Sequence, residues 1–212
     1  MTIILTKPPK SARKAKGDGH MRRAEILQAA ERIFVRDGYQ GATIRKIADE
    51  VGVSSTALYM HFRDKDDILL EICAGAVETL LALNTEIAAR PGCPVERVRL
   101  MLDAYMRFGL DNPNTYWLTF CSAADDLASD KHVVAAELRE RCYDRFKGTI
   151  ALIAEEGRLR SSVETAAQVL WAACHGLIAL RLGRPLIEWG PNEELMAAML
   201  DSLFLGQIVS PS

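Results

Sequence analysis

TIRKIADEVGVSSTALYMHF, residues 43–62, is the stretch that decides the fold of this chain. Its first half places apolar residues at the i, i+3, i+4 and i+7 positions of a helix that buries one face: Ile44, Ile47, Ala48 and Val51. Gly52 follows at the position where helices end in a left-handed cap, and Ser54 is a good N-cap for a second helix. The pattern therefore predicts two short helices joined by a tight turn.

The outer face of the second predicted helix is unusual because it contains no acidic residue. Leu58 and Phe62 lie one turn apart and point toward the inside. The other side chains are small hydrogen-bonding groups, an aromatic ring, a thioether and cationic tips: Ser55, Thr56, Tyr59, Met60, His61 and Arg63. A helix of about two turns with this face fits the major groove of DNA. The alternative is an ordinary helical hairpin within a core.

The flanking segments predict two more helices. Before the motif, RRAEILQAAERIFVRDGYQGA (residues 22–42) is amphipathic, and Gly38 is expected to close it. After the motif, Asp64 is expected to cap a long helix whose first turn holds Asp66 and Asp67. Acidic residues suit that position because the N-terminal end of a helix is the positive end of its dipole.

These helices resemble the N-terminal domain of the TetR family of transcriptional regulators over residues 22–72. The resemblance rests on a Thr that opens the second helix, then V-G-V-S, then A-L-Y-x-H-F with a Lys shortly after. It implies an all-α fold of about nine helices, in which a three-helix helix-turn-helix domain precedes a helical domain for ligand binding and dimerisation. One departure is Thr56-Ala57, where many members carry Gly-Thr. The hydroxyl and methyl of Thr56 change the local base contacts, so the operator sequence does not transfer.

The chain divides into three predicted parts: a disordered basic arm (1–20), the DNA-binding domain (21–66) and the ligand-binding and dimerisation domain (67–212). Residues 1–63 hold 12 Lys and Arg against 6 Asp and Glu, a balance of +6, and the remainder holds 14 against 22, a balance of −8. A positive head on a negative body orients a protein toward a polyanion. The arm either lies along DNA phosphates or is a solvated tail.

Chemistry and the resemblance together suggest the residues that contact DNA. Thr43 is expected to cap its helix and to offer its hydroxyl to a phosphate. Arg45 is expected to pair with a phosphate or to reach a guanine edge. The resemblance places Tyr59 and Lys65 at positions that contact phosphates. The candidates for reading bases, with the cap that orients them, are Ser54, Ser55, Thr56, Met60 and His61.

From Ile68 onward the pattern is helical, with breaks at Pro- and Gly-rich segments. It predicts helices near residues 65–89, 95–110, 114–127, 130–156, 162–182 and 192–206. Aromatic side chains with an OH or NH tip suit a small-molecule pocket, and the resemblance implies an inducer among the central helices. The pocket candidates, each alternatively a plain core residue, are Tyr105, Phe108, Tyr116, Trp117, Phe120, Tyr143, Trp171 and His175. This lining favours a small apolar or aromatic effector.

The segment Trp171-Ala-Ala-Cys-His175-Gly176 resembles the C-terminal domain of a large branch of the family named for its Trp, His and Gly (WHG). Trp171 and His175 are i, i+4 partners on one helix face. His175 either faces a ligand or joins two helices as a buried polar contact, and the sequence leaves both possibilities open.

A homodimer is expected because one helix-turn-helix buries too little surface to bind tightly, and palindromic operators match two-fold proteins. In the family the last two helices usually form the interface. The candidates are Val169, Ala173, Leu177, Leu195, Met199 and Leu203, some of which must belong to the core of their own subunit.

Several other classes of function receive little support from the sequence. The five cysteines are too widely spread for a C-x-x-C pair, and Cys174 and His175 point about 100° apart on a helix, so neither a metal nor a cofactor is expected. No Walker loop, zinc-protease motif or nucleophile elbow is present, which argues against an enzyme. The apolar run at residues 1–5 is too short for a signal peptide or a membrane span. The sequence thus predicts a cytoplasmic, ligand-responsive repressor, with a redox or metal sensor and a helical interaction module as alternatives.

Overall fold

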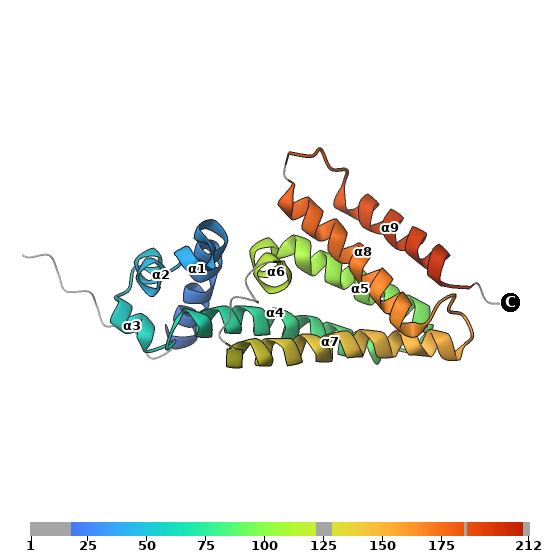
Figure 1. Cartoon of the computed structure of the whole chain (residues 1–212), viewed down its shortest axis with the longest axis horizontal. Coiled ribbons are helices and arrows are strands. Elements are labelled where there is room, and N and C mark those ends of the chain that lie inside the picture. Colours follow the sequence, from blue (N-terminus) through green and yellow to red (C-terminus); the bar gives the residue numbers. More distant parts are fainter. Residues whose placement is uncertain (1–17, 122–128, 185, 210–212) are drawn as a thin grey trace, which may run out of the picture.

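The computed structural model describes residues 18–121, 129–184 and 186–209, and within these ranges the chain forms nine α-helices and no strand (Figure 1). The all-α fold expected from the sequence is confirmed. The expected basic arm, residues 1–20, lies outside the described residues except for its last three.

The first three helices form the unit that we call the head, and the other six form the body. The head contains α1 (Asp18–Gly41), α2 (Ile44–Val51) and α3 (Ser55–Tyr59). The body contains α4 (Lys65–Ala88), α5 (Pro94–Asp111), α6 (Pro113–Phe120), α7 (Ser129–Glu155), α8 (Val163–Gly183) and α9 (Asn192–Gln207). The bounds of the body helices agree with the predicted ones within one residue, except that α6 ends at Phe120, whereas the prediction continued it to residue 127. In the head, α1 begins at Asp18, four residues before the expected start at residue 22.

The predicted caps of the head helices are confirmed. The Thr43 hydroxyl accepts a hydrogen bond from the Lys46 amide at 3.2 Å, and the Ser54 hydroxyl accepts one from the Ala57 amide at 3.1 Å. Gly52 closes α2 in the left-handed conformation, with φ 72°. Each of these two hydrogen bonds satisfies an amide that the first helical turn leaves without a partner.

Two details of the head differ from the prediction. Gly38 takes φ 71° and ψ 166° and so interrupts α1, but the chain adds one more turn that ends at Gly41. The helix α3 has only five residues, so Phe62 lies beyond its end instead of in its second turn. The side chain of Phe62 is nevertheless buried beside Leu58, as the spacing predicted.

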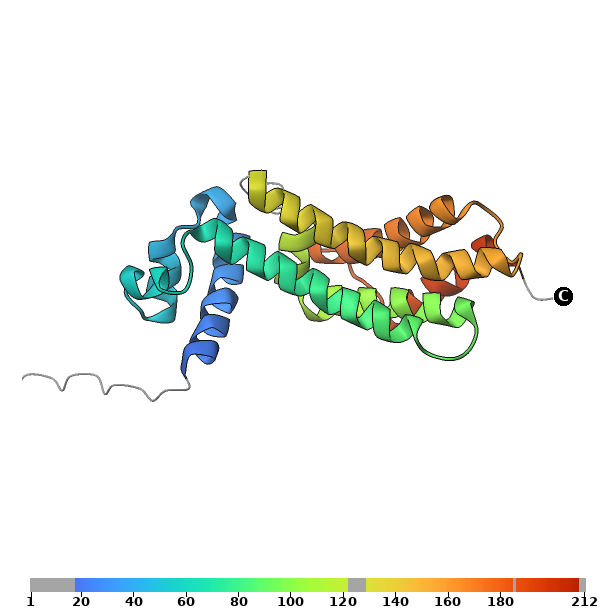
Figure 2. The same cartoon turned by 90° about the horizontal axis from the view of Figure 1, so that it is seen from below.

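The body is an elongated bundle in which α4 and α7 lie side by side along most of their length (Figures 1 and 2). The helix α4 starts at the head and runs into the body. The helices α8 and α9 lie on the side of the body opposite α4 and α7 (Figure 1). Both α4 and α8 are long and apolar enough to cross a membrane by length and composition alone. In this fold they pack against neighbouring helices of the bundle.

The core of the head extends into the body. One buried cluster joins head residues such as Ile47 and Leu58 to Leu118 of α6 and Ala135 of α7. A second cluster fills the body around α5, α7 and α8. The helices α6 and α7 of the body therefore share a buried core with the head.

Candidate nucleic-acid interface and effector cavity

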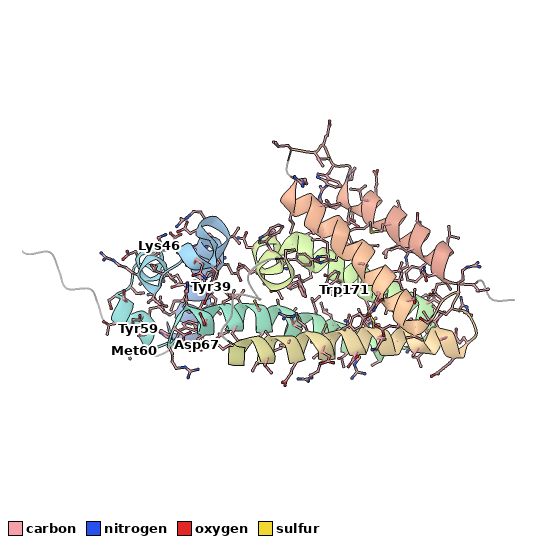
Figure 3. All side chains as sticks on the ribbon, viewed as in Figure 1. Tyr39, Lys46, Tyr59, Met60, Asp67 and Trp171 are labelled. Atoms are coloured by element: carbon pink, nitrogen blue, oxygen red, sulfur yellow. The ribbon has the colours of Figure 1, made fainter. Side chains whose placement is uncertain are left out.

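The surface of α3 lies at the outer end of the head, away from the body (Figure 3). Met60 is 85% exposed and Tyr59 is 55% exposed, although both are large apolar or aromatic side chains. Thr56 is also exposed, whereas Ser55 and His61 are half-buried. No acidic side chain occurs between Ser54 and Arg63. This face can therefore approach a polyanion without electrostatic repulsion from its own helix.

Arg23 fixes the end of α3 from below. Its Nη1 atom donates to the carbonyl oxygen of His61 at 2.8 Å, and its Nε atom donates to Glu71 of α4 at 2.7 Å. The guanidinium also lies 4.2 Å from the ring centroid of Phe62. Arg23 closely follows the expected basic arm in the sequence, but the structure gives it an internal role that positions α3 against α4.

Lys65 is held at the junction of α1 and α4. Its Nζ atom donates to the Tyr39 carbonyl at 2.8 Å and lies 3.9 Å from the centroid of the Tyr39 ring. The Tyr39 hydroxyl donates to the carboxylate of Asp66. The carbonyl contact uses one of the three donors of the ammonium group. A phosphate contact at Lys65 therefore stays a prediction.

The N-terminal end of α2 presents a second candidate contact. Thr43 is exposed, and the side chain of Arg45 is 87% exposed with only a loose contact to Asp49, at 3.9 Å. Lys46 differs because its Nζ atom donates to Asp37 at 2.6 Å and to the Gly41 carbonyl at 2.9 Å. The guanidinium of Arg45 is therefore open to a partner, whereas Lys46 ties α2 to α1.

A buried lysine joins the start of α7 to the start of α4, next to the head. Lys131, in the first turn of α7, is only 8% exposed, and its Nζ atom lies 2.6 Å from Asp64 and 2.7 Å from Asp67. Hydrogen bonds from Arg63 and Lys131 hold the pKa of Asp67 well below its usual range. The start of α7 is thus tied to the N-cap of α4. The sequence gives no sign of this contact, because Lys131 is 67 residues away from Asp64.

The body contains a cavity of about 450 Å³ between α4, α5, α6, α7 and α8. Five of the expected residues line it: Tyr105, Phe120, Tyr143, Trp171 and His175. Trp171 lies on α8 within the body (Figure 3). The volume is within the range of about 300–1,000 Å³ that is usual for small-molecule sites.

Three expected pocket residues do not line the cavity. Tyr116 is fully buried behind it, where its hydroxyl lies 2.6 Å from His175 Nδ1 and 2.8 Å from the Tyr105 hydroxyl. Trp117 lies against α8 near Gly183, and Phe108 packs on the core of the body. The spacing of aromatic residues located the region but could not separate the wall from the layer behind it.

His175 combines the two roles that the sequence left open. It lines the cavity, and it also joins α8 to α5 and α6 through Tyr105 and Tyr116. Burial lowers the pKa of His175, and burial raises the pKa of both tyrosines. The imidazole is therefore neutral near pH 7. In the tautomer whose Nδ1 atom carries no proton, that atom accepts a hydrogen bond from the Tyr116 hydroxyl.

The cavity also has polar lining residues that the aromatic pattern did not indicate: Asn84 of α4 and Arg139, Glu140 and Cys142 of α7. They lie on long amphipathic helices where one polar residue among many gives no separate signal.

Burial raises the pKa of Cys73 and Cys142 to about 11 and that of Cys174 to about 12. Such thiols are protonated at neutral pH and react slowly. In the part of the chain that the structure describes, no group of three His, Cys, Asp or Glu residues could hold a metal ion.

The candidate dimer residues fall into two groups. Leu177 is 8% exposed and belongs to the core of its own subunit, which corrects its assignment to the interface. Val169 is exposed, and the other four are half-buried: Ala173, Leu195, Met199 and Leu203. The prediction missed two strongly exposed leucines on the same two helices, Leu180 (52%) and Leu205 (78%).

Both the N-terminal and the C-terminal part of the chain resemble known regulatory proteins. Residues 26–72 match a family model described as bacterial regulatory proteins, tetR family, and residues 98–203 match one described as tetracyclin repressor-like, C-terminal domain. The HTH-type transcriptional repressor AcnR of Corynebacterium diphtheriae is 46% identical over 82 residues, which span 39% of this chain and only 40% of that protein. AcnR of Corynebacterium efficiens is 31% identical over 145 residues, which span 66% of this chain and 70% of the relative. The crystal structure of PfmR, a TetR family transcriptional regulator from Thermus thermophilus, matches with a TM-score of 0.75 at 25% identity and covers 90% of this chain and 98% of that chain.

Proposed function

The chain belongs to the TetR family of bacterial regulatory proteins, and on that premise we propose that it is a ligand-responsive repressor that binds a palindromic DNA operator as a homodimer. The observation that carries the proposal is the exposed, acid-free face of α3 at the outer end of the head. A helix with this face, held by Arg23 and by the cap at Ser54, has the shape and charge to enter a major groove. The proposal includes the division of the chain into a basic arm (1–20), a DNA-binding domain (21–66) and a domain for ligand binding and dimerisation (67–212).

The contacts to DNA divide by chemistry. Thr43, Arg45, Tyr59 and Lys65 would contact the phosphate backbone and fix the register of the head. Ser54 orients α3, and the candidates for contacts to base edges are Ser55, Thr56, Met60 and His61. Hydroxyl and thioether groups carry little hydrogen-bond information, so thymine methyl contacts and DNA shape supply part of the specificity.

The cavity supports the ligand response. It is bounded by α4, which starts at the head, and by α6, which contributes Leu118 to the core of the head. A small effector that filled the cavity would shift these helices and change the spacing of the two heads of a dimer. Induction requires the effector to prefer the state that does not bind DNA by a few kcal/mol.

The pattern of Trp171, His175 and Gly176 supports assignment of the C-terminal domain to the WHG branch. His175 joins α8 to α5 and α6, which is a structural reason for a histidine at this position. Gly176 has no neighbouring atom within 4 Å of where a Cβ would lie, so a second helix can approach α8 closely there. In this arrangement α8 and α9 form the dimer interface. A repressor of this kind works in the bacterial cytoplasm, where the DNA is.

A gel shift with DNA from upstream of the protein's own gene, followed by selection of bound genomic fragments, tests the proposal. Lys65→Ala is expected to weaken binding to every sequence and to reduce the slope of log K against log salt by about 0.9 for each phosphate that the variant no longer neutralises. Arg90→Ala is the matched control, because Arg90 pairs with Glu86 on the surface of the body. An unchanged slope for Lys65→Ala would exclude a phosphate contact at Lys65. Failure to bind any fragment in dilute buffer would contradict the proposed function itself.

A further inference from the structure

Arg139 of α7 lines the cavity and has an unsatisfied hydrogen-bond donor. Its Nη1 atom is buried, and no acceptor among the described residues lies within hydrogen-bonding distance of that atom. Arg97 also has a buried nitrogen without an acceptor, but its Nη1 atom donates to the Ala88 carbonyl at 2.9 Å. A buried N–H without an acceptor is unfavourable, most of all on a charged group. An anion in the cavity would remove this penalty.

The other polar groups of the lining are already satisfied or are open to solvent. Five of the uncharged ones have hydrogen-bond partners within the protein: Asn84, Tyr105, Thr119, Tyr143 and His175. Trp171 is 41% exposed. Glu140 is the one carboxylate in the described lining. It is exposed, it points about 100° away from Arg139 on the helix, and no ion pair joins the two in the described structure. Arg139 is therefore the group left to bind a polar part of a ligand.

The rest of the lining is mostly apolar and defines the other end of the ligand. It includes Val77, Leu80, Met101, Leu102, Phe120 and Phe146. No lysine and no second arginine occurs in the described lining, so the cavity can compensate one negative charge and not two. A guanidinium group also matches the planar geometry of a carboxylate, which it binds with two parallel hydrogen bonds.

We propose that the effector is an apolar monocarboxylate whose carboxylate group pairs with Arg139 while its apolar body fills the rest of the cavity. This inference rests on the proposed function, since it names the class of ligand for the cavity of a ligand-responsive repressor. It also indicates that ligand binding acts on α7. Arg139 lies about two turns after Lys131, which ties the start of the same helix to Asp64 and Asp67 at the start of α4, next to the head.

Calorimetric titration of the DNA-free wild-type protein tests the head group directly. The probes are decanoate, decanol, decylamine and decyl phosphate, which share one apolar body. Decanoate is expected to bind at least about tenfold more tightly than decanol, because a hydrogen bond to a charged group is worth more than one to a neutral group. The inference is wrong if decanoate does not bind, or if any of the other three probes binds as tightly.

Variants of Arg139 then assign the preference to this residue. Arg139→Gln should remove the preference for decanoate over decanol while leaving the affinity for decanol unchanged. Arg139→Lys should keep part of the preference for decanoate, because the positive charge remains but the planar pair of donors is lost. Arg141→Gln removes the same charge from an exposed position on the same helix and should behave as wild type. A preference that survives in Arg139→Gln, or that disappears in Arg141→Gln, would overturn the assignment.

Two further measurements separate this inference from the proposed function. Thermal unfolding shows whether Arg139→Gln is folded, and if it is not, the probe series on the wild-type protein decides the question alone. A gel shift without any ligand reports DNA binding, which Arg139→Gln should leave unchanged. A protein that selects decanoate through Arg139 but binds no DNA would refute the proposed function and support the inference. A protein that binds DNA but does not distinguish the four probes would support the proposed function and refute the inference.

Discussion

At Gly109 the backbone of α5 lies directly against the ring of Tyr116. A Cβ atom at this position would lie 2.8 Å from Tyr116 Cδ2 and 2.9 Å from Ile178 Cγ2, both on fully buried side chains. Neither neighbour has room to move, so Gly109→Ala forces the core apart. We expect it to lower the free energy of unfolding by about 1–3 kcal/mol, measured by urea denaturation.

Gly75→Ala is the matched control for this substitution. Gly75 lies on an exposed part of α4, and a Cβ there would meet nothing within 4 Å. Because alanine favours a helix more than glycine, the change is expected to raise stability by up to about 1 kcal/mol. Equal effects of the two substitutions would contradict the crowding at Gly109.

The buried state of His175 predicts a dependence of stability on pH. Burial lowers its pKa in the folded protein below the value of about 6.5 expected in the unfolded chain. As the pH falls below about 6.5, the unfolded state therefore binds more protons, and the free energy of unfolding decreases. The decrease should be smaller in His175→Gln, which stays neutral. Parallel stability curves for the two proteins, from denaturation at a series of pH values, would exclude this role.

Residues whose contacts are local could be predicted from the sequence, and those with distant partners could not. Thr43 and Ser54 each bond to an amide three residues later, so a short motif contains the whole interaction. Arg23 bonds to Glu71, 48 residues away, and nothing in the adjacent sequence marks either residue. Arg139 was missed for a related reason, because its importance comes from the absence of a partner, which only the packed structure shows.

At the scale of elements, α6 has two faces that serve different parts of the molecule. Leu118 is buried in the core of the head, and the Thr115 hydroxyl donates to Glu31 of α1 at 3.0 Å. Tyr116 and Phe120 instead contact each other in the body, with ring centroids 5.1 Å apart. A helix of eight residues therefore connects the wall of the cavity to the first helix of the head.

Removal of the head-facing side chain of α6 tests this connection. Leu118→Ala leaves a cavity in the core of the head, and we expect it to lower the free energy of unfolding by about 2–5 kcal/mol. Leu100→Ala, at a position on α5 that is 42% exposed, should change it by no more than about 0.5 kcal/mol. Chemical denaturation of both variants provides the measurement. A small effect at Leu118 would mean that α6 contributes little to the head.

The bounds of the body helices could be predicted because Pro and Gly residues mark their ends. For α3 the prediction was too long, and the reason is again a distant contact. The spacing of Leu58 and Phe62 fits a continuing helix, but Arg23 binds the carbonyl of His61, and Asp64 then caps α4. A periodic pattern shows which side chains are buried, but it does not show where the backbone leaves the helix.

At the scale of the whole molecule, one subunit leaves apolar surface uncovered on α8 and α9. Leu180 is 52% exposed and Leu205 is 78% exposed, whereas Leu170 and Leu200 on the same helices are buried. Exposed apolar surface on adjacent helices is typical of an interface between subunits. The sequence alone could not separate the inward from the outward leucines, because both helices are apolar on several faces.

A charge in this surface tests the proposed homodimer. Leu180→Glu would place a carboxylate in the interface without a partner, so it should shift the protein toward monomers in sedimentation equilibrium. Operator affinity should fall together with the dimer fraction, because each head alone covers only half of a palindromic site. Leu100→Glu adds the same charge at a similarly exposed position on α5 and should leave the dimer intact. If both variants stay dimeric and bind the operator as wild type does, the subunits must pair through a surface that does not include Leu180.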